Sequence, residues 1–252
     1  MRKARSPARS ASRKAATRPA SVAPQARPGK AGKPAKKGLR VVLFGAGGMV
    51  GSRIAREALS RGHEVVAVQR NPGGLDLDGR HLMTVAGDAT DPGSVARLAK
   101  GADAVVSAVS PRNPPGAGTL PKAAKALLEG TRQAGVRRLV VVGGAGSLSV
   151  GPSSRLVDSP QFPDAYRPEA MEHVDALQVY RSQGQGVDWT FISPPAMIMP
   201  GRRTGKYQVG QDDLLTAQDG QSHISAEDYA VALVDELERG ENKGRRMTVA
   251  WP

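Results

Sequence analysis

The sequence VVLFGAGGMVG, residues 41–51, runs from an apolar segment of strand length into three glycines at three-residue spacing, Gly45, Gly48 and Gly51. An amphipathic segment follows, so the pattern predicts a buried strand that turns sharply into a helix. The start of such a helix presents unpaired N–H groups and the positive end of its dipole, which suits a phosphate. The three glycines would allow a tight turn, close approach of a pyrophosphate and close helix packing, as in dinucleotide sites.

A glycine triplet is weak evidence by itself. Glycine makes up 30 of the 252 residues, and an ordinary strand-turn-helix is the alternative interpretation. The position of the triplet strengthens the hypothesis, because it follows an expected strand and opens the first expected helix. We therefore expect the whole turn to bind a cofactor through Gly45, Ala46, Gly47, Gly48, Met49, Val50 and Gly51.

Charge divides the chain into a basic tail, residues 1–38, and a remainder, residues 39–252. The tail holds twelve of the 36 Lys and Arg residues and none of the 23 Asp and Glu residues, so the remainder is nearly neutral. A neutral remainder argues against a folded nucleic-acid-binding domain. The chain has no cysteine, which excludes disulfides, thiolate catalysis and cysteine-ligated metals.

The tail is expected to be disordered, because Arg, Lys, Ala, Pro and Ser cannot bury enough apolar surface to offset the entropy of ordering. Three roles stay open for residues 1–38: a solvated tail without a role, weak contact with nucleic acid or another polyanion, and organelle targeting. We expect no contact with a membrane, because no apolar stretch approaches the roughly 18–20 residues of a membrane span. The expected location is the cytoplasm.

From Leu39 onward, short valine-rich runs alternate with segments of helical periodicity. The runs are typical of strands buried on both faces of a parallel sheet. Strands are predicted at residues 40–45, 64–69, 81–86, 103–109, 137–142, 187–192 and 246–250. Helices are predicted at residues 49–61, 92–100, 119–134, 168–184 and 226–239. Glycines stand where three of the helices should end: Gly62, Gly101 and Gly135.

This alternation predicts an α/β fold, a Rossmann-like doubly wound parallel sheet with right-handed crossovers. Residues 194–221 are rich in Pro, Gly and polar residues and interrupt the alternation. Ser225 then fits the N-cap of the last helix, with Asp228 at the third helical position. We expect a single folded domain, residues 39–252, with a short C-terminal extension on the substrate side.

Arg70 ends the second predicted strand, nineteen residues after Gly51. A site that prefers NAD(H) carries an acidic residue at about this place, where it holds the ribose 2′-hydroxyl. Here the guanidinium of Arg70 matches a 2′-phosphate in charge and in fork geometry. The sequence therefore favours NADP(H) over NAD(H), with an exposed loop arginine as the alternative.

The ends of the next three predicted strands should meet the cofactor at the same sheet edge. Asp88 and Ala89 would contact the adenine, unless Asp88 is a loop aspartate that caps the helix near Pro92. Small residues at the fourth and fifth strand ends leave room for ribose and phosphates: Ser107, Ala108, Val109, Gly143 and Gly144.

With these motifs the chain resembles an atypical short-chain dehydrogenase/reductase of the NADH-flavin reductase-like group, which is also similar to biliverdin reductase B, a flavin reductase. The motifs that carry the resemblance are residues 45–51, 141–148, 188–195, 200–207 and 224–230. The resemblance implies a cofactor site at the glycine turn, Arg70, Asp88 and the strand ends, and a substrate pocket roofed by residues 194–210. It also implies that three residues lie beside the nicotinamide: Pro194, Ala196 and Met197. Methionines 197 and 199 would suit a flat apolar substrate, or would simply fill the core.

One departure from the wider superfamily bears on the chemistry. Typical members carry a Tyr-x-x-x-Lys proton-transfer pair, but here Tyr166 is followed four residues later by Ala170, and Tyr180 by Gly184. Without this pair, alcohol–ketone interconversion and sugar epimerisation lack their general acid and base. A flavin or quinone needs less, because hydride can pass to an aligned ring while protons come from solvent.

The sequence therefore predicts an NADPH-dependent reductase of a small planar acceptor, with a flavin as one candidate substrate. Two alternatives stay open, an NADP(H)-sensing protein without catalysis and a nucleotide-sugar-type epimerase or reductase. His173 is the candidate proton donor, unless it is a surface histidine or pairs with Glu169 or Glu172. Ser147 is a weaker candidate that could hydrogen-bond cofactor or substrate. The four histidines show no metal-ligand spacing, and nothing indicates an oligomeric state.

Overall fold

The computed structural model describes residues 27–28, 38–72, 78–111 and 117–252. Within them, nine strands form one sheet in the order β4-β3-β2-β5-β6-β9-β13-β11-β1, and the strands from β4 to β13 are parallel. The sheet strands are β1 (Arg27–Pro28), β2 (Arg40–Phe44), β3 (Glu64–Gln69), β4 (Leu82–Ala86), β5 (Ala104–Ser107), β6 (Arg138–Val142), β9 (Asp188–Ser193), β11 (Gln208–Gly210) and β13 (Arg245–Ala250). Two small pairs lie outside it, β7 (Ser149–Gly151) with β8 (Ser154–Arg155), and β10 (Met197–Met199) with β12 (His223–Ser225).

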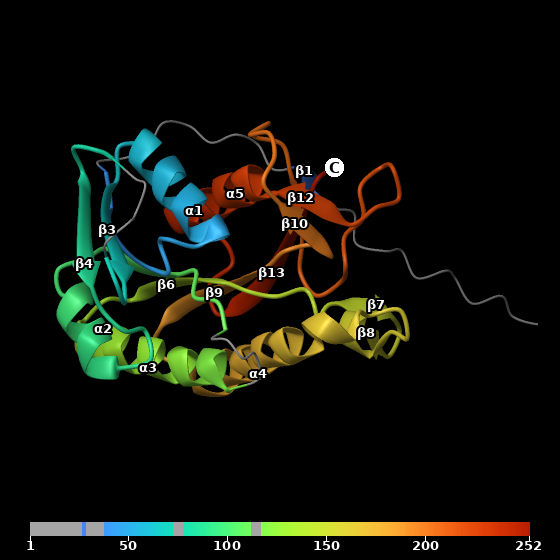
Figure 1. The fold of residues 1–252 in the computed structure, drawn as a ribbon, viewed down its shortest axis with the longest axis horizontal. Helices are drawn as coiled ribbons and strands as arrows, with labels where there is room; N and C mark the ends of the chain where they lie inside the picture. Colours follow the sequence, from blue (N-terminus) through green and yellow to red (C-terminus); the bar gives the residue numbers. More distant parts are fainter. Residues whose placement is uncertain (1–26, 29–37, 73–77, 112–116) are drawn as a thin grey trace, which may run out of the picture.

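Helices cover both faces of the sheet (Figure 1). Helices α1 (Met49–Ser60) and α5 (Ala226–Arg239) lie together on one face. The other face carries α2 (Pro92–Ala99), α3 (Thr119–Gln133) and α4 (Arg167–Gln183). Successive side chains of a strand point to opposite faces, so Leu43 packs in the core under α1 and α5 while Phe44 packs in the core under the other three helices.

The predicted fold class is confirmed, and each predicted helix and strand is present within two residues of its expected ends. The helix-ending glycines Gly62, Gly101 and Gly135 have φ values of 84°, 74° and 71°, a backbone conformation that glycine adopts without strain. Ser225 caps α5 as predicted, because its side chain accepts a hydrogen bond of 3.0 Å from the Asp228 N–H.

One expectation about the strands is wrong. Strand β4 is not buried on both faces, since it forms one edge of the described sheet and Met83 is 57% exposed. The segment 194–221, which interrupts the alternation, contains β10 and β11. Both are three-residue strands, too short to show a period of two in the sequence. Strand β11 pairs antiparallel to β13 and so extends the sheet beyond its parallel part.

Most of the basic tail, residues 1–26 and 29–37, lies outside the described residues, so its expected disorder and the boundary at residue 38 stay predictions. Arg27 and Pro28 form β1, opposite Val209 and Gln208 of β11. A proline is acceptable there because the strand lies at a sheet edge. Within the described ranges, no helix has the length and apolar character that crossing a membrane requires.

Candidate functional site

The glycine turn joins β2 to α1 at the carboxyl edge of the parallel strands. Gly45 has a φ of 81° and donates from its N–H to the Val68 carbonyl at 3.1 Å. The Gly48 N–H then closes the turn on the Gly45 carbonyl at 3.2 Å. Gly48 is the N-cap of α1, and no side chain of the described residues caps this helix end. The first N–H groups of α1 are therefore available to a ligand.

Close backbone contacts explain why this turn needs glycine. A Cβ atom on Gly45 would lie 2.4 Å from the Ala108 carbonyl oxygen of the chain that leaves β5. A Cβ atom on Gly51 would lie 2.0 Å from the Gly45 carbonyl oxygen. Gly51 thus lets α1 pack against the turn, as its spacing predicts. The binding of a cofactor by this turn stays a prediction.

A cavity of about 300 Å³ opens beside the glycine turn, between the carboxyl ends of β2, β3, β4 and β5. Eight of the predicted cofactor residues line it: Gly45, Gly47, Gly48, Arg70, Asp88, Ala89, Ala108 and Val109. The other predicted cofactor residues are not part of its wall: Ala46, Met49, Val50, Gly51, Ser107, Gly143, Gly144, Pro194, Ala196 and Met197. The volume is at the lower end of the range for small-molecule sites.

Gln69, at the end of β3, also lines the cavity and was not predicted from the sequence. Its amide lies over Gly47, where a Cβ atom would be only 2.7 Å from the Gln69 Oε1 atom. Its Nε2 atom is buried and has no hydrogen-bond partner among the described residues. A buried amide without a partner is costly, and the polar groups of a nucleotide would supply one. This unpaired donor, the open end of α1 and Arg70 together fit a phosphorylated nucleotide.

Arg70 and Asp88 lie on the cavity wall, and the surroundings of Asp88 answer one open question. The Asp88 Oδ1 atom accepts hydrogen bonds of 2.8 Å from both the N–H and the hydroxyl of Thr90. Helix α2 is capped instead by Asp91, which accepts from the Gly93 N–H at 3.0 Å. Asp88 is therefore a loop aspartate that bonds the backbone two residues on, as the alternative held, although Asp91 and not Asp88 caps α2; the contact of Asp88 with adenine stays a prediction.

His173 lies on the inner side of α4, against the strand ends. A Cβ atom on Gly144 would come within 2.7 Å of the His173 side chain. Burial lowers the pKa of His173 to about 4, although Glu172 opposes the shift. Glu172 itself accepts a hydrogen bond of 2.8 Å from the Leu120 N–H at the start of α3. His173 is therefore half-buried, it interacts electrostatically with Glu172, and it is uncharged at neutral pH.

Ser147 holds the chain after β6 in place. Its hydroxyl accepts from the Arg246 Nη1 atom at 2.8 Å, and its carbonyl accepts from the same atom at 3.1 Å. Arg246 is buried and also pairs with Asp212. The hydroxyl of Ser147 thus already serves as an anchor to β13, and its proposed part in catalysis stays a prediction.

The residues expected beside the nicotinamide differ in exposure. Pro194 is buried, whereas Ala196 is exposed and Met197 is 45% exposed. Met199 is 58% exposed, so the alternative that these methionines fill the core is wrong. Within the described residues no group of three or more His, Asp or Glu side chains could hold a metal ion.

The depressed pKa of His173 predicts a pH dependence of stability. An unfolded histidine titrates near pH 6.5, so between about pH 6.5 and pH 4 only the unfolded chain takes up this proton. The free energy of unfolding should therefore fall as the pH drops through this window, and His173 should contribute no pH dependence above it. Urea titrations of wild type and His173→Gln should show a loss about 3 kcal/mol larger for wild type between pH 7 and pH 4.

The exposed His81 provides the control, since His81→Gln should follow the wild-type profile. Parallel profiles for wild type and His173→Gln would show that the His173 ring is not shielded from protonation, and any constant offset between such parallel curves would report lost packing alone.

Comparisons with known proteins agree with this geometry. A family model described as NAD(P)H-binding matches residues 45–239. The crystal structure of a Burkholderia pseudomallei protein, provisionally named an exported protein, is 47% identical, covers 84% of this chain and 100% of its own, and has a TM-score of 0.77. A Bacteroides thetaiotaomicron protein, provisionally named an epimerase, is 39% identical over 85% of this chain and 98% of its own, with a TM-score of 0.79. A Streptococcus pneumoniae protein, provisionally named an NADH-flavin reductase, is 33% identical over 85% of this chain and 100% of its own, with a TM-score of 0.74.

Proposed function

Because the chain belongs to the NAD(P)H-binding family, we propose that it is an oxidoreductase that uses NADPH to reduce a flavin, a quinone or a similar planar acceptor. The resemblance to flavin reductase-like short-chain dehydrogenases is confirmed, and a nicotinamide cofactor follows from the family. The acceptor class and the preference for NADPH are the proposal. The proposed preference for NADPH is supported by the cavity, because Arg70 is part of its wall.

One observation carries the choice of acceptor: the described part of α4 presents no tyrosine–lysine pair to the strand ends. Tyr180 is buried between Trp189 and Phe191, with ring centroids 5.9 and 6.0 Å away, and burial raises the pKa of its hydroxyl. Tyr166 precedes the helix and is 64% exposed. A reaction that needs a hydroxyl acid, such as alcohol oxidation or epimerisation, is poorly served by this arrangement.

Reduction of a planar redox acceptor needs fewer catalytic groups on the protein. Bound NADPH would supply the hydride, and the chain would orient the two reactants and exclude water from them. The glycine turn and Arg70 would hold the phosphates, while the exposed faces of Met197 and Met199 would offer an apolar surface to the acceptor. A neutral His173 could direct a hydrogen bond at the acceptor, with protons coming from solvent.

The direct test is oxidation of NADPH by the purified full chain with FMN, FAD or menadione as the acceptor. We expect loss of NADPH absorbance above the enzyme-free rate with at least one acceptor, and a slower rate with NADH. Tight NADPH binding with no turnover on any acceptor would favour the NADP(H)-sensing alternative. Absence of nucleotide binding would refute both.

Epimerase chemistry has less support than reduction of a planar acceptor. The Bacteroides thetaiotaomicron neighbour is provisionally named an epimerase. The missing tyrosine–lysine pair counts against that chemistry in this chain, because epimerisation of a sugar needs a positioned acid and base.

A cytoplasmic location is also part of the proposal. The chain offers no helix in its described part that could cross a membrane, but the Burkholderia pseudomallei neighbour is provisionally named an exported protein. Cell fractionation of the tagged full chain would decide the location.

A further inference from the structure

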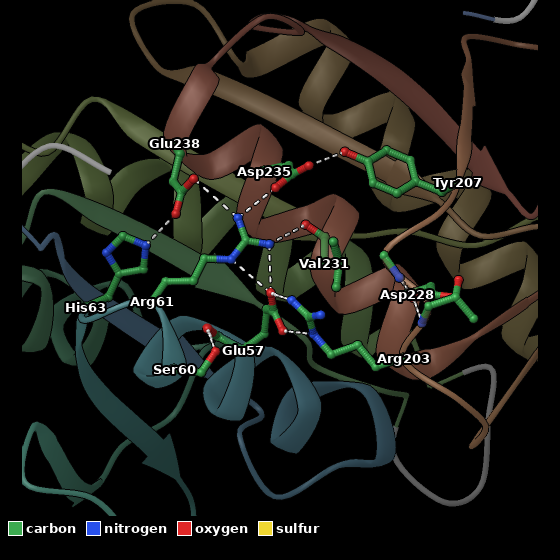
Figure 2. Close-up of polar contacts among 12 residues, drawn as sticks. Glu57, Ser60, Arg61, His63, Arg203, Tyr207, Asp228, Val231, Asp235 and Glu238 are labelled. Atoms are coloured by element: carbon green, nitrogen blue, oxygen red, sulfur yellow. Dashed lines mark hydrogen bonds and ion pairs between the residues drawn. The ribbon is translucent and has the colours of Figure 1, made fainter. Parts of the chain in front are cut away.

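Residues 200–207, here called the strap, leave β10 and cross onto α1 and α5, far from the glycine turn in the sequence. Figure 2 shows where the strap meets the two helices through Arg203 and Tyr207. Arg203 makes two hydrogen bonds to Glu57 of α1, from Nε at 2.7 Å and from Nη2 at 2.8 Å. The Tyr207 hydroxyl donates to Asp235 of α5. The strap is thus bound to both helices by side chains of the protein itself.

Glu57 is the centre of the contact with α1. Its side chain is only 5% exposed and also accepts from the Arg61 Nε atom at 2.8 Å (Figure 2). Burial alone raises the pKa of Glu57, but Arg203 and Arg61 lower it more, so the group is ionised. A buried carboxylate with two arginine partners fixes geometry well, because a displaced partner would leave a buried charge poorly compensated.

A second set of contacts links the start of the strap to the glycine turn. The Gly201 N–H donates to Glu227 Oε2 at 2.7 Å, while Glu227 Oε1 accepts from Arg53 Nε at 2.6 Å. Arg53 in turn donates from Nη1 to the Met49 carbonyl at 2.8 Å, in the first turn of α1. A continuous series of hydrogen bonds therefore joins Met49, next to the glycine turn, to Gly201, two residues after β10.

Asp228 completes the attachment. It is fully buried and accepts hydrogen bonds of 2.7 Å from the Thr204 and Gly205 N–H groups and from Trp251 Nε1. These contacts of the strap all lie within the chain and need no ligand to form. Together they form a bracket that attaches the segment after β10 to both α1 and α5.

We infer that Arg203 is a positioning residue, which holds β10 and its methionine face at a fixed distance from the cofactor turn. The inference rests on the proposed function, because it assigns β10 to the acceptor side. In the proposed function the methionine face of β10 binds the acceptor, so a displaced β10 would weaken acceptor binding, which appears as a higher acceptor KM with little change in kcat. Arg203 is the charged side chain of the strap that bonds α1 directly. It is 55% exposed, and Arg61 stays paired with Glu57 when Arg203 is replaced, so the replacement should not unfold the domain.

The chain offers a matched control in the neighbouring Arg202. Arg202 is also exposed, but only its carbonyl takes part in the described contacts, accepting from the Ser225 hydroxyl at 2.8 Å. Arg203→Gln and Arg202→Gln therefore remove the same charge at adjacent positions. Arg203→Lys keeps the charge and can reach one Glu57 oxygen, which provides a rescue variant.

The experiment measures KM and kcat for FMN and for menadione at saturating NADPH, the NADPH Kd by nicotinamide fluorescence, and Tm for each full-length variant. We expect Arg203→Gln to raise the acceptor KM about tenfold, with kcat and the NADPH Kd within about threefold of wild type. Arg202→Gln should match wild type, and Arg203→Lys should recover part of the loss.

Two results would overturn the inference. A lower Tm with an unchanged acceptor KM would make Arg203 a purely structural residue. A rise in the NADPH Kd as large as the rise in acceptor KM would place its effect on the cofactor side. If wild type itself reduces neither FMN nor menadione, both the proposed function and this inference fail. If wild type is active and Arg203→Gln has wild-type kinetics, only the inference fails.

Discussion

Replacing Gly51 with alanine should abolish NADPH binding and lower the free energy of unfolding by about 3 kcal/mol. The new Cβ atom would lie 2.0 Å from the Gly45 carbonyl oxygen, 2.9 Å from its carbonyl carbon and 3.1 Å from the Ala46 Cα atom. These neighbours are backbone atoms, so α1 must move away from the turn. Urea unfolding and NADPH fluorescence titration measure the two effects.

Gly48→Ala separates ligand approach from folding. Its Cβ atom would meet only the Gly45 carbonyl oxygen, at an ordinary contact distance of 3.5 Å, so the free energy of unfolding should hardly change. If the pyrophosphate lies against this residue, NADPH affinity should still fall steeply. Gly151→Ala is the control for both, because it places a Cβ atom in open space. Normal NADPH binding by Gly48→Ala would move the phosphate away from the turn.

The second large effect concerns the choice between the two nicotinamide cofactors. Arg70→Glu should raise the NADPH Kd about a hundredfold, because it removes a charge-assisted pairing and places a carboxylate beside the 2′-phosphate. The NADH Kd should change by less than about threefold, since NADH carries a 2′-hydroxyl that a carboxylate can accept from. Titration of each nucleotide, monitored by fluorescence, measures the ratio directly.

Arg97→Glu gives the same change of charge on an exposed residue of α2 that is not part of the cavity wall. It should leave both Kd values near wild type. The effect of Arg70→Glu should also shrink as salt rises, since Arg70 is exposed and its field is screened. Equal weakening of NADPH and NADH by Arg70→Glu would mean that Arg70 does not contact the 2′-position.

The sequence predicts this fold well because the parallel strands and their helices are local patterns. Valine runs such as β3 and glycines with positive φ, such as Gly62 and Gly135, carry their signals within a few residues. The strap contacts are different, because Glu57 and Arg203 are separated by 146 residues. No periodicity or composition links two charges so far apart, and either alone resembles a solvated surface residue.

The candidate site also has residues that local sequence patterns predict and residues that they do not. The glycine turn and Arg70 were predictable because spacing from a strand end fixes their place at the sheet edge. The need for glycine at position 143 was not predictable from the sequence. A Cβ atom there would come within 2.2 Å of the Phe191 ring, which belongs to a strand nearly fifty residues later. Gln69 was missed because an amide at a strand end has no distinctive pattern. Only its burial without a partner marks it.

The exposed strand β4 has a consequence for how this protein can change over generations. Leu43 packs in the core on one face of the sheet and Phe44 in the core on the other face. A substitution of either residue disturbs the packing of its own core. Arg70 and the loop after β4 stand at the rim of the sheet, where most substitutions cost little stability. Arg70, the proposed determinant of nucleotide preference, therefore lies where sequence drift is tolerated. A lineage could exchange one cofactor for another through a few surface replacements, without repacking either core.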